Sequence, residues 1–111
     1  MSSAVQSIKI NATPAKCYKV IWDFENYPEY IDDLNEVEVK NKKSTTCEVT
    51  YHIKIIKDIT YTLNMKGTKS KKIEWSFVNG DFMKDNHGFW DFKEIKKGVT
   101  EATYSIDVSL G

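Results

Sequence analysis

The chain has 111 residues, 41% of them hydrophobic and 13% aromatic, so it is long enough for one folded domain and too apolar for a disordered segment. Its 16 basic and 16 acidic side chains cancel, and every basic residue is lysine. This balance, without the planar fork of arginine, disfavours binding to nucleic acid, and we expect no such partner.

The N-terminal segment lacks the basic start and apolar core of a signal peptide, and no apolar run approaches the roughly 20 residues of a membrane span. We therefore expect a cytoplasmic protein without a transmembrane segment. Cys17 and Cys47 have no ligand cluster around them in the sequence. They are predicted to be reduced core residues.

Residues 4–10 are predicted to form a short strand at a sheet edge. A helix should follow, because Thr13 can cap it and Pro14 suits the first helical position. Its apolar stripe has helical spacing. A second short helix or turn is expected over residues 28–34, since Pro28 cannot continue the first helix. The residues of the stripe are Cys17, Val20, Ile21 and Phe24.

From residue 36 onward the apolar period changes to two, which predicts strands with one buried and one solvated face. Polar segments between the runs predict short turns and hence a meander of hairpins. One longer polar link is expected between Phe77 and Trp90, with His87 in a loop. The predicted strands are 36–40, 47–55, 59–66, 73–77, 90–92 and 102–110.

The chain carries an ordered set of short motifs: IxATPxxxxxVIWDFENYPEY at 10–30, VEV at 37–39, IEWSFVNGDF at 73–82, GFWDF at 88–92 and TEATYSIDV at 100–108. With these motifs it resembles the polyketide cyclase/Coq10-like branch of the START/SRPBCC superfamily. The resemblance implies an α+β helix-grip fold over residues 1–111, with a seven-stranded curved antiparallel sheet and two short helices after the first strand. It also implies an apolar cavity for a lipid, quinone or polyketide-like molecule.

Members of this family continue past the last strand into a long C-terminal helix that closes the cavity. The sequence ends at Gly111, where that helix would begin, so we expect a domain truncated at its C-terminus. An uncovered aromatic face would exceed the apolar patch that a monomer tolerates. A homo-oligomer, a partner chain or a bound ligand could cover it.

Strand parity brings aromatic and aliphatic side chains onto one sheet face, which could form either a solid core or the wall of a ligand cavity. With the resemblance, we favour a cavity. The predicted lining is Tyr51, Ile53, Tyr61, Leu63, Trp75, Phe77, Trp90, Phe92, Tyr104 and Ile106. The predicted rim is Trp22, Tyr27, Tyr30, Ile31 and Phe82.

The leading hypothesis is non-enzymatic binding of a hydrophobic small molecule, with tyrosine hydroxyls orienting its polar end. A cyclase or aromatase, acting without metal, is the second hypothesis, although Glu74 and Asp91 fall on the solvated face and no catalytic residue is assigned. A macromolecular interaction module, associated with ribosomes or the respiratory chain, is the third. Because His52 and His87 lack partners at metal spacing, neither a metal nor a cofactor is expected.

Overall fold

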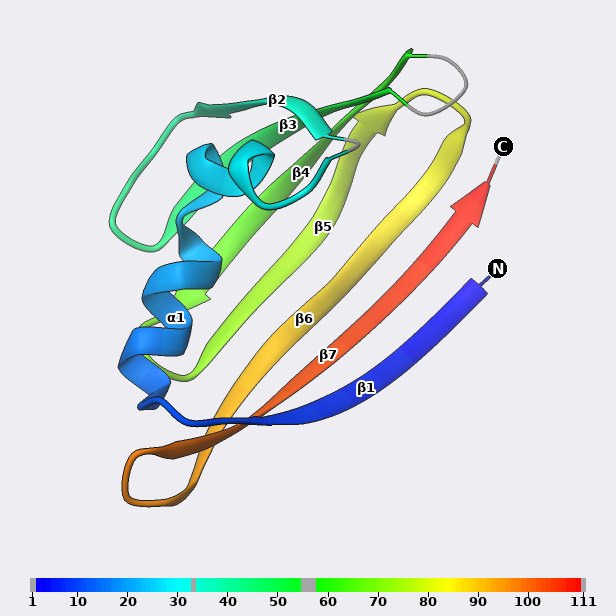
Figure 1. Cartoon of the computed structure of the whole chain (residues 1–111). Coiled ribbons are helices and arrows are strands. Elements are labelled where there is room, and N and C mark those ends of the chain that lie inside the picture. The colour runs from blue at the N-terminus through cyan, green and yellow to red at the C-terminus, as the bar shows by residue number, and fades with distance from the viewer. Residues whose placement is uncertain (1, 33, 55–57, 111) are drawn as a thin grey trace.

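The computed structural model describes residues 2–32, 34–54 and 58–110. Strands dominate it, and two short helices follow the first strand (Figure 1). The elements, in chain order, are β1 (Ser2–Ile10), α1 (Pro14–Trp22), the 3₁₀ helix η1 (Phe24–Glu29), β2 (Leu34–Lys40), β3 (Thr46–Lys54), β4 (Asp58–Thr68), β5 (Lys72–Gly80), β6 (Met83–Lys96) and β7 (Val99–Leu110).

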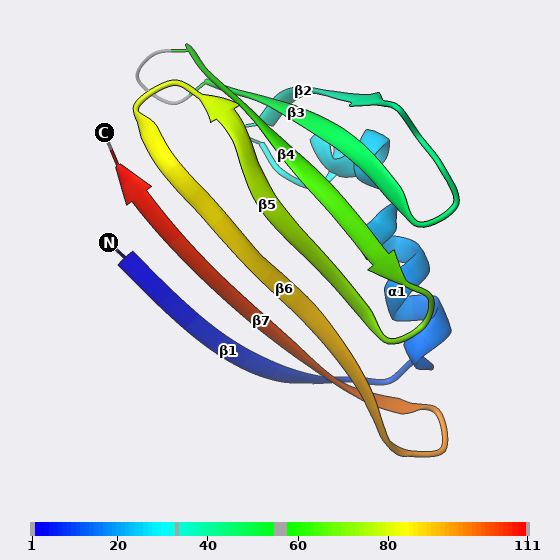
Figure 2. The ribbon, with the colours of Figure 1, turned by 180° about the vertical axis from the view of Figure 1, so that it is seen from behind.

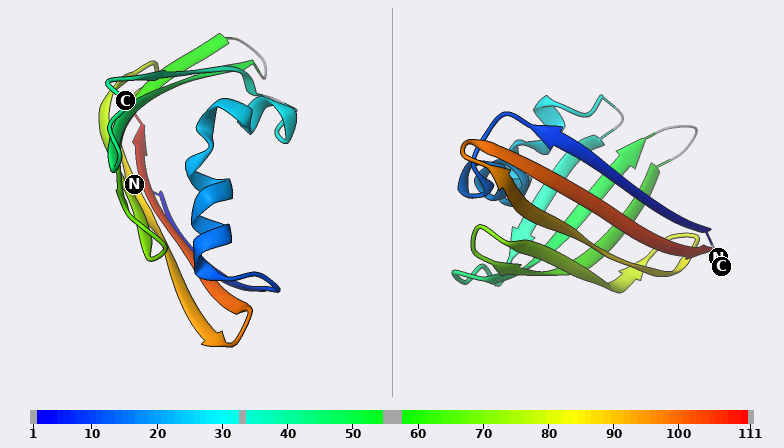
Figure 3. Two further views of the ribbon diagram at one scale, coloured as in Figure 1. Left: turned by 90° about the vertical axis from the view of Figure 1, so that its left-hand side faces the viewer. Right: turned by 90° about the horizontal axis from the view of Figure 1, so that it is seen from below.

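The seven strands of the described ranges form one antiparallel sheet in the order β1-β7-β6-β5-β4-β3-β2. The predicted meander is therefore confirmed from β2 to β7, and β1 lies at an edge, where Ser2 pairs with Val108. Both helices lie on the concave side of the curved sheet (Figure 3). The convex side has no helix over it (Figure 2). This α+β arrangement is the one expected from the sequence.

The first helix begins as predicted: the Thr13 hydroxyl accepts a hydrogen bond from the Lys16 amide, and Pro14 occupies the first turn. The second helix was placed too late in the chain. It spans Phe24–Glu29, with Pro28 inside it. A 3₁₀ helix this short accommodates proline because few of its amides need a partner within the helix. Its turn is stabilised instead by Asn26, whose side-chain amide donates to the Asp23 carboxylate at 2.5 Å.

The largest difference between the predicted and observed strands concerns β6, which begins at Met83 and not near Trp90. The predicted polar link is reduced to a tight turn at 81–82, where Phe82 has φ +58°. The polar residues before Trp90 are strand residues in which alternate side chains point to opposite faces. His87 is therefore in a strand and not in a loop, and Asn86 points to the concave side.

Gly67 follows the predicted strand 59–66, where a turn was expected, but it lies inside β4. Side chains of α1 pack directly against its backbone. A Cβ atom on Gly67 would lie 1.9 Å from the Tyr18 hydroxyl oxygen and 3.1 Å from the Trp22 ring. The missing side chain lets Tyr18 lie against the strand backbone, where it also meets the edge of Phe92 with centroids 6.5 Å apart. Close approach of this kind is a common reason for glycine in a strand.

The hydrophobic core lies between α1, η1 and the concave face. Val49, Ile73 and Ala102 are fully buried there. Cys17 and Cys47 are buried and not disulfide-bonded, as predicted for core residues. Ile55, the last residue of the predicted strand 47–55, and Lys57, in the turn expected after it, lie outside the described residues. No helix in the described ranges has the length and hydropathy to cross a bilayer.

We predict that Gly67→Ala lowers the free energy of unfolding by about 1–3 kcal/mol, the usual cost of overpacking a core. The loss should shrink in a Tyr18→Phe background, because the nearest clashing atom is the Tyr18 hydroxyl oxygen. Urea denaturation of the double-mutant cycle measures both effects. Thr68→Ala, at the exposed neighbouring position, is the control. An unchanged stability of Gly67→Ala would contradict the packing argument.

Candidate ligand-binding cavity

A cavity of about 470 Å³ lies between the concave face of the sheet and the two helices. Its volume is in the range of small-molecule sites. The sheet supplies one wall through β3 to β7, and the end of α1 together with the segment that follows it supplies the other. The lining residues are Val20, Ile21, Tyr27, Tyr30, Ile31, Leu34, Tyr51, Ile53, Tyr61, Leu63, Met65, Trp75, Asn86, Trp90, Tyr104 and Ile106.

Aromatic rings pack against one another along the sheet wall. Tyr51 and Tyr61 stack with centroids 5.0 Å apart across the β3–β4 pair. Tyr104 lies between two indoles, 5.7 Å from the Trp75 ring and 4.8 Å from the Trp90 ring. These contacts hold the rings in place, so the wall is pre-organised for an apolar ligand.

The tyrosine hydroxyls differ in what they bind. The Tyr27 hydroxyl donates to the Ile21 carbonyl and so ties η1 to the end of α1. In the described part of the chain, no residue is hydrogen-bonded to the hydroxyls of Tyr51, Tyr61 or Tyr104. These three phenols are therefore available to a ligand.

Burial keeps these phenols protonated. It raises the pKa of Tyr61 to about 12, and Tyr104 adds to the shift. Burial also raises the pKa of Tyr51 well above its usual value, with smaller contributions from Tyr27 and Tyr61. Burial also raises the pKa of Tyr104. The cavity therefore presents neutral hydroxyl groups at every physiological pH.

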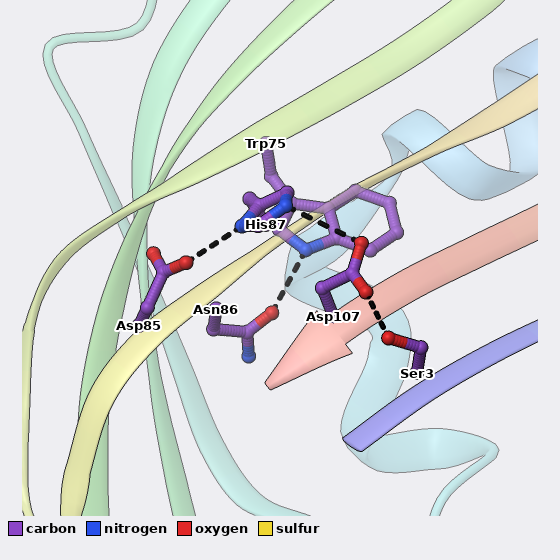
Figure 4. Close-up of polar contacts among 6 residues, drawn as sticks. All are labelled: Ser3, Trp75, Asp85, Asn86, His87 and Asp107. Atoms are coloured by element: carbon purple, nitrogen blue, oxygen red, sulfur yellow. Dashed lines mark hydrogen bonds and ion pairs between the residues drawn. The ribbon is translucent and has the colours of Figure 1, made fainter. Parts of the chain in front are cut away.

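One amide lies among the rings. The Trp75 indole N–H donates to Asn86 Oδ1 at 3.0 Å, and both side chains are buried (Figure 4). Trp75 pairs with Gly88 across β5 and β6, and a Cβ atom on Gly88 would lie 2.1 Å from the Ser105 carbonyl oxygen of β7 and 2.6 Å from the indole ring. The bare backbone of Gly88 thus lets the indole lie across β6 and reach Asn86, two residues along the same face.

The family model described as polyketide cyclase/dehydrase and lipid transport matches residues 1–111. The chain belongs to this family. A search of the curated proteins gives no match. Solved structures similar to this chain include an aromatase/cyclase, a START superfamily protein and a STAR-related lipid transfer protein, and they show that it has their helix-grip fold.

Three of these structures illustrate the range. The Zhui aromatase/cyclase from Streptomyces sp. R1128 has a TM-score of 0.89 at 13% identity, covering 99% of this chain and 68% of that one. A START superfamily protein from Mycobacterium smegmatis has a TM-score of 0.84 at 11% identity, and the match covers 98% of this chain and 77% of that one. A STAR-related lipid transfer protein from Xanthomonas axonopodis has a TM-score of 0.82 at 13% identity, and the match covers 98% of this chain and 70% of that one. At these identities the likeness shows the fold alone.

In this family member, all but two of the ten predicted lining residues do line the cavity. The exceptions are Phe92, which is 5% exposed and packs beneath Tyr18 of α1, and Phe77, which lies beside Gly80 at the end of β5. Strand alternation assigns a side chain to one face of the sheet, but it does not show whether a helix covers the side chain there. That the lining residues contact a ligand stays a prediction.

Of the five predicted rim residues, the structure places Tyr27, Tyr30 and Ile31 in the cavity lining. Trp22 does not line it, because its ring stacks on Tyr18 at 5.7 Å and packs against Phe24. Phe82 does not either, since it lies in the β5–β6 turn. The sequence reasoning missed five lining residues: Val20, Ile21, Leu34, Met65 and Asn86.

Of these five, four carried a usable signal. Val20 and Ile21 belong to the apolar stripe of α1, and Met65 continues the alternation of Tyr61 and Leu63. Leu34 is the apolar residue at the start of β2. Asn86 carried none, because a polar residue in an apparent loop does not indicate a buried position.

A second polar group, here called the outer cluster, lies on the convex face of the sheet. His87 contacts Asp85 at 2.7 Å and Asp107 at 3.3 Å, and the Ser3 hydroxyl donates to the same Asp107 (Figure 4). The serine is bonded to a carboxylate and not to the histidine, so the order needed for a nucleophilic triad is absent from the cluster. It joins β1, β7 and β6 near the chain ends.

Glu36, Glu38 and His52 also lie on the convex face, where their ligand atoms are within 4.8 Å of one another. Sequence spacing did not reveal the group, because His52 joins it only through the pairing of β2 with β3. Both glutamates are exposed, and the group lies on the opposite side of the sheet from the cavity.

The buried tyrosines predict a loss of stability at alkaline pH. The pKa values of Tyr51 and Tyr61 are higher in the folded chain than their unfolded value of about 10. The contribution of Tyr61 is therefore complete below about pH 10 and is lost as the pH rises through about 12. The contribution of Tyr51 is likewise complete below about pH 10 and is lost as the pH rises through its raised pKa. Urea unfolding over this range should show the decline, and Tyr61→Phe should reduce it.

Tyr30→Phe is the control for this experiment, because Tyr30 is 67% exposed. It should leave the alkaline decline unchanged. A decline of the same size in Tyr61→Phe as in the unmodified chain would show that Tyr61 is not a source of it.

Proposed function

We propose that the chain binds a neutral hydrophobic small molecule in the cavity, without chemical conversion. The observation that carries the proposal is the make-up of the lining, which is aromatic and aliphatic apart from the phenol groups and one amide. No described lining residue carries a formal charge. Apolar surface removed from water supplies roughly 25 cal/mol per Å², so such a wall favours apolar ligands.

The aromatase/cyclases among the similar structures suggest polyketide cyclisation as the alternative. Cyclisation needs a general base near the reacting carbon. The described lining offers phenols whose pKa values are raised by burial, and it contains no carboxylate, imidazole or amine. Phenols of this kind are suited to donating hydrogen bonds, which supports binding over catalysis. The interaction-module hypothesis and a homo-oligomer over the cavity mouth stay predictions.

Titration with the neutral fluorophore N-phenyl-1-naphthylamine tests the proposal. We expect saturable binding at one site, weakened about tenfold in Trp90→Ala, because a lost ring contact of about 1.4 kcal/mol corresponds to that factor. Phe89→Ala is the matched control, since Phe89 is the adjacent residue of β6 on the opposite face, where Lys72 lies 4.9 Å from its ring. It should leave the affinity unchanged.

Urea denaturation of both variants separates binding from folding. Trp90 is only partly buried, so Trp90→Ala should remain folded. Absence of saturable binding by the unmodified chain, or equal weakening by the two alanine variants, would count against a ligand in this cavity.

A further inference from the structure

We infer that the cavity selects a ligand with an uncharged oxygen acceptor, such as a keto or ester carbonyl, and that the Asn86 side-chain amide donates the selecting hydrogen bond. The inference rests on the proposed binding function and adds to it the chemical class of the ligand. It also assigns a specificity-determining residue that the sequence reasoning placed in a loop.

The orientation of the Asn86 amide follows from its partner. An indole N–H can only donate, so the atom of Asn86 that lies 3.0 Å from Trp75 Nε1 must be the oxygen. Turning the amide over would place two donors against each other inside the protein, where an unpaired donor is unfavourable. Trp75 therefore holds Asn86 in one of its two orientations.

This orientation leaves the Nδ2 group for the cavity. Figure 4 shows the oxygen of Asn86 directed at the indole and the nitrogen turned away from it. Asn86 is 5% exposed and lines the cavity. None of the described residues accepts a hydrogen bond from Nδ2. A ligand oxygen would supply the missing partner.

The surroundings restrict the kind of acceptor. Other donors of the lining include the hydroxyls of Tyr51, Tyr61 and Tyr104. No described lining side chain is cationic, so a carboxylate or phosphate would lose its hydration without gaining a counter-charge. A neutral carbonyl oxygen accepts hydrogen bonds and costs much less to desolvate. The apolar rings beside Asn86 then suit the hydrocarbon part of the same molecule.

A matched pair of probes tests the inference. Benzophenone and diphenylmethane have the same two rings and differ in the central group, which is a carbonyl in the first and a methylene in the second. We expect the unmodified chain to bind benzophenone at least tenfold more tightly, because a site built to donate a hydrogen bond rejects the analogue that cannot accept it. Isothermal titration calorimetry or competition against N-phenyl-1-naphthylamine gives both affinities.

Substitutions identify the donor. Asn86→Leu should remove the preference for benzophenone while diphenylmethane still binds, since leucine has a similar volume and no donor. Trp75→Phe should reduce the preference by releasing the amide from its fixed orientation, which makes Trp75 a positioning residue. Asn79→Leu, at an exposed amide on β5, is the matched control and should keep the preference intact.

Photolabelling gives a second test that needs no variant. Irradiated benzophenone inserts its carbonyl carbon into a nearby C–H bond, so the labelled peptide marks where the carbonyl lies. We expect the label on Trp75, Asn86 or Ile106. A label confined to the helix side, at Tyr30 or Ile31, would overturn the inference.

The outcomes separate the two proposals. Equal binding of benzophenone and diphenylmethane, or a preference that survives in Asn86→Leu, overturns the role of Asn86 and leaves the apolar binding site intact. Binding of neither probe, together with no binding of N-phenyl-1-naphthylamine, overturns the proposed function and this inference with it.

Discussion

The contact between Trp75 and the bare backbone of Gly88 determines how the cavity is built. The indole lies across β6 because position 88 has no side chain, and its N–H then reaches Asn86 further along the strand. Tyr104 packs against the same indole from β7. Three neighbouring strands are thus joined on their concave side by one ring. A larger residue at position 88 would displace the indole, the amide orientation and the stacking together.

Gly67 has the corresponding role under the helix. It allows Tyr18 to approach β4, which brings α1 close to the sheet at that end. At the other end, the chain turns away through η1, and Tyr27 ties this segment back to Ile21. The helices therefore lie close to the sheet over Phe92 and leave a space over Trp90 and Tyr104. Two glycines in neighbouring parts of one sheet separate a packed core from a cavity.

Strand alternation predicted most of the sheet, because side chains in a strand alternate between faces whatever the rest of the fold does. It assigned Tyr51, Tyr61, Trp75 and Tyr104 to one face, and all four line the cavity. It failed between Met83 and Phe89, where the intervening residues on both faces are polar or small. There the solvated side carries Asp85 and His87 and the buried side carries an amide, so no apolar period is present.

Within the described ranges, the sequence by itself determined the antiparallel pairing of consecutive strands, the cap of α1 and which strand residues share the concave face, since each depends on residues near one another in the chain. Only the tertiary structure decided that a space remains beside this face and that Asn86 points into it. Both depend on distances between elements that are far apart in sequence. The fit of Tyr18 against Gly67 and of the Trp75 indole over Gly88 sets those distances, and no local pattern of residues encodes either contact.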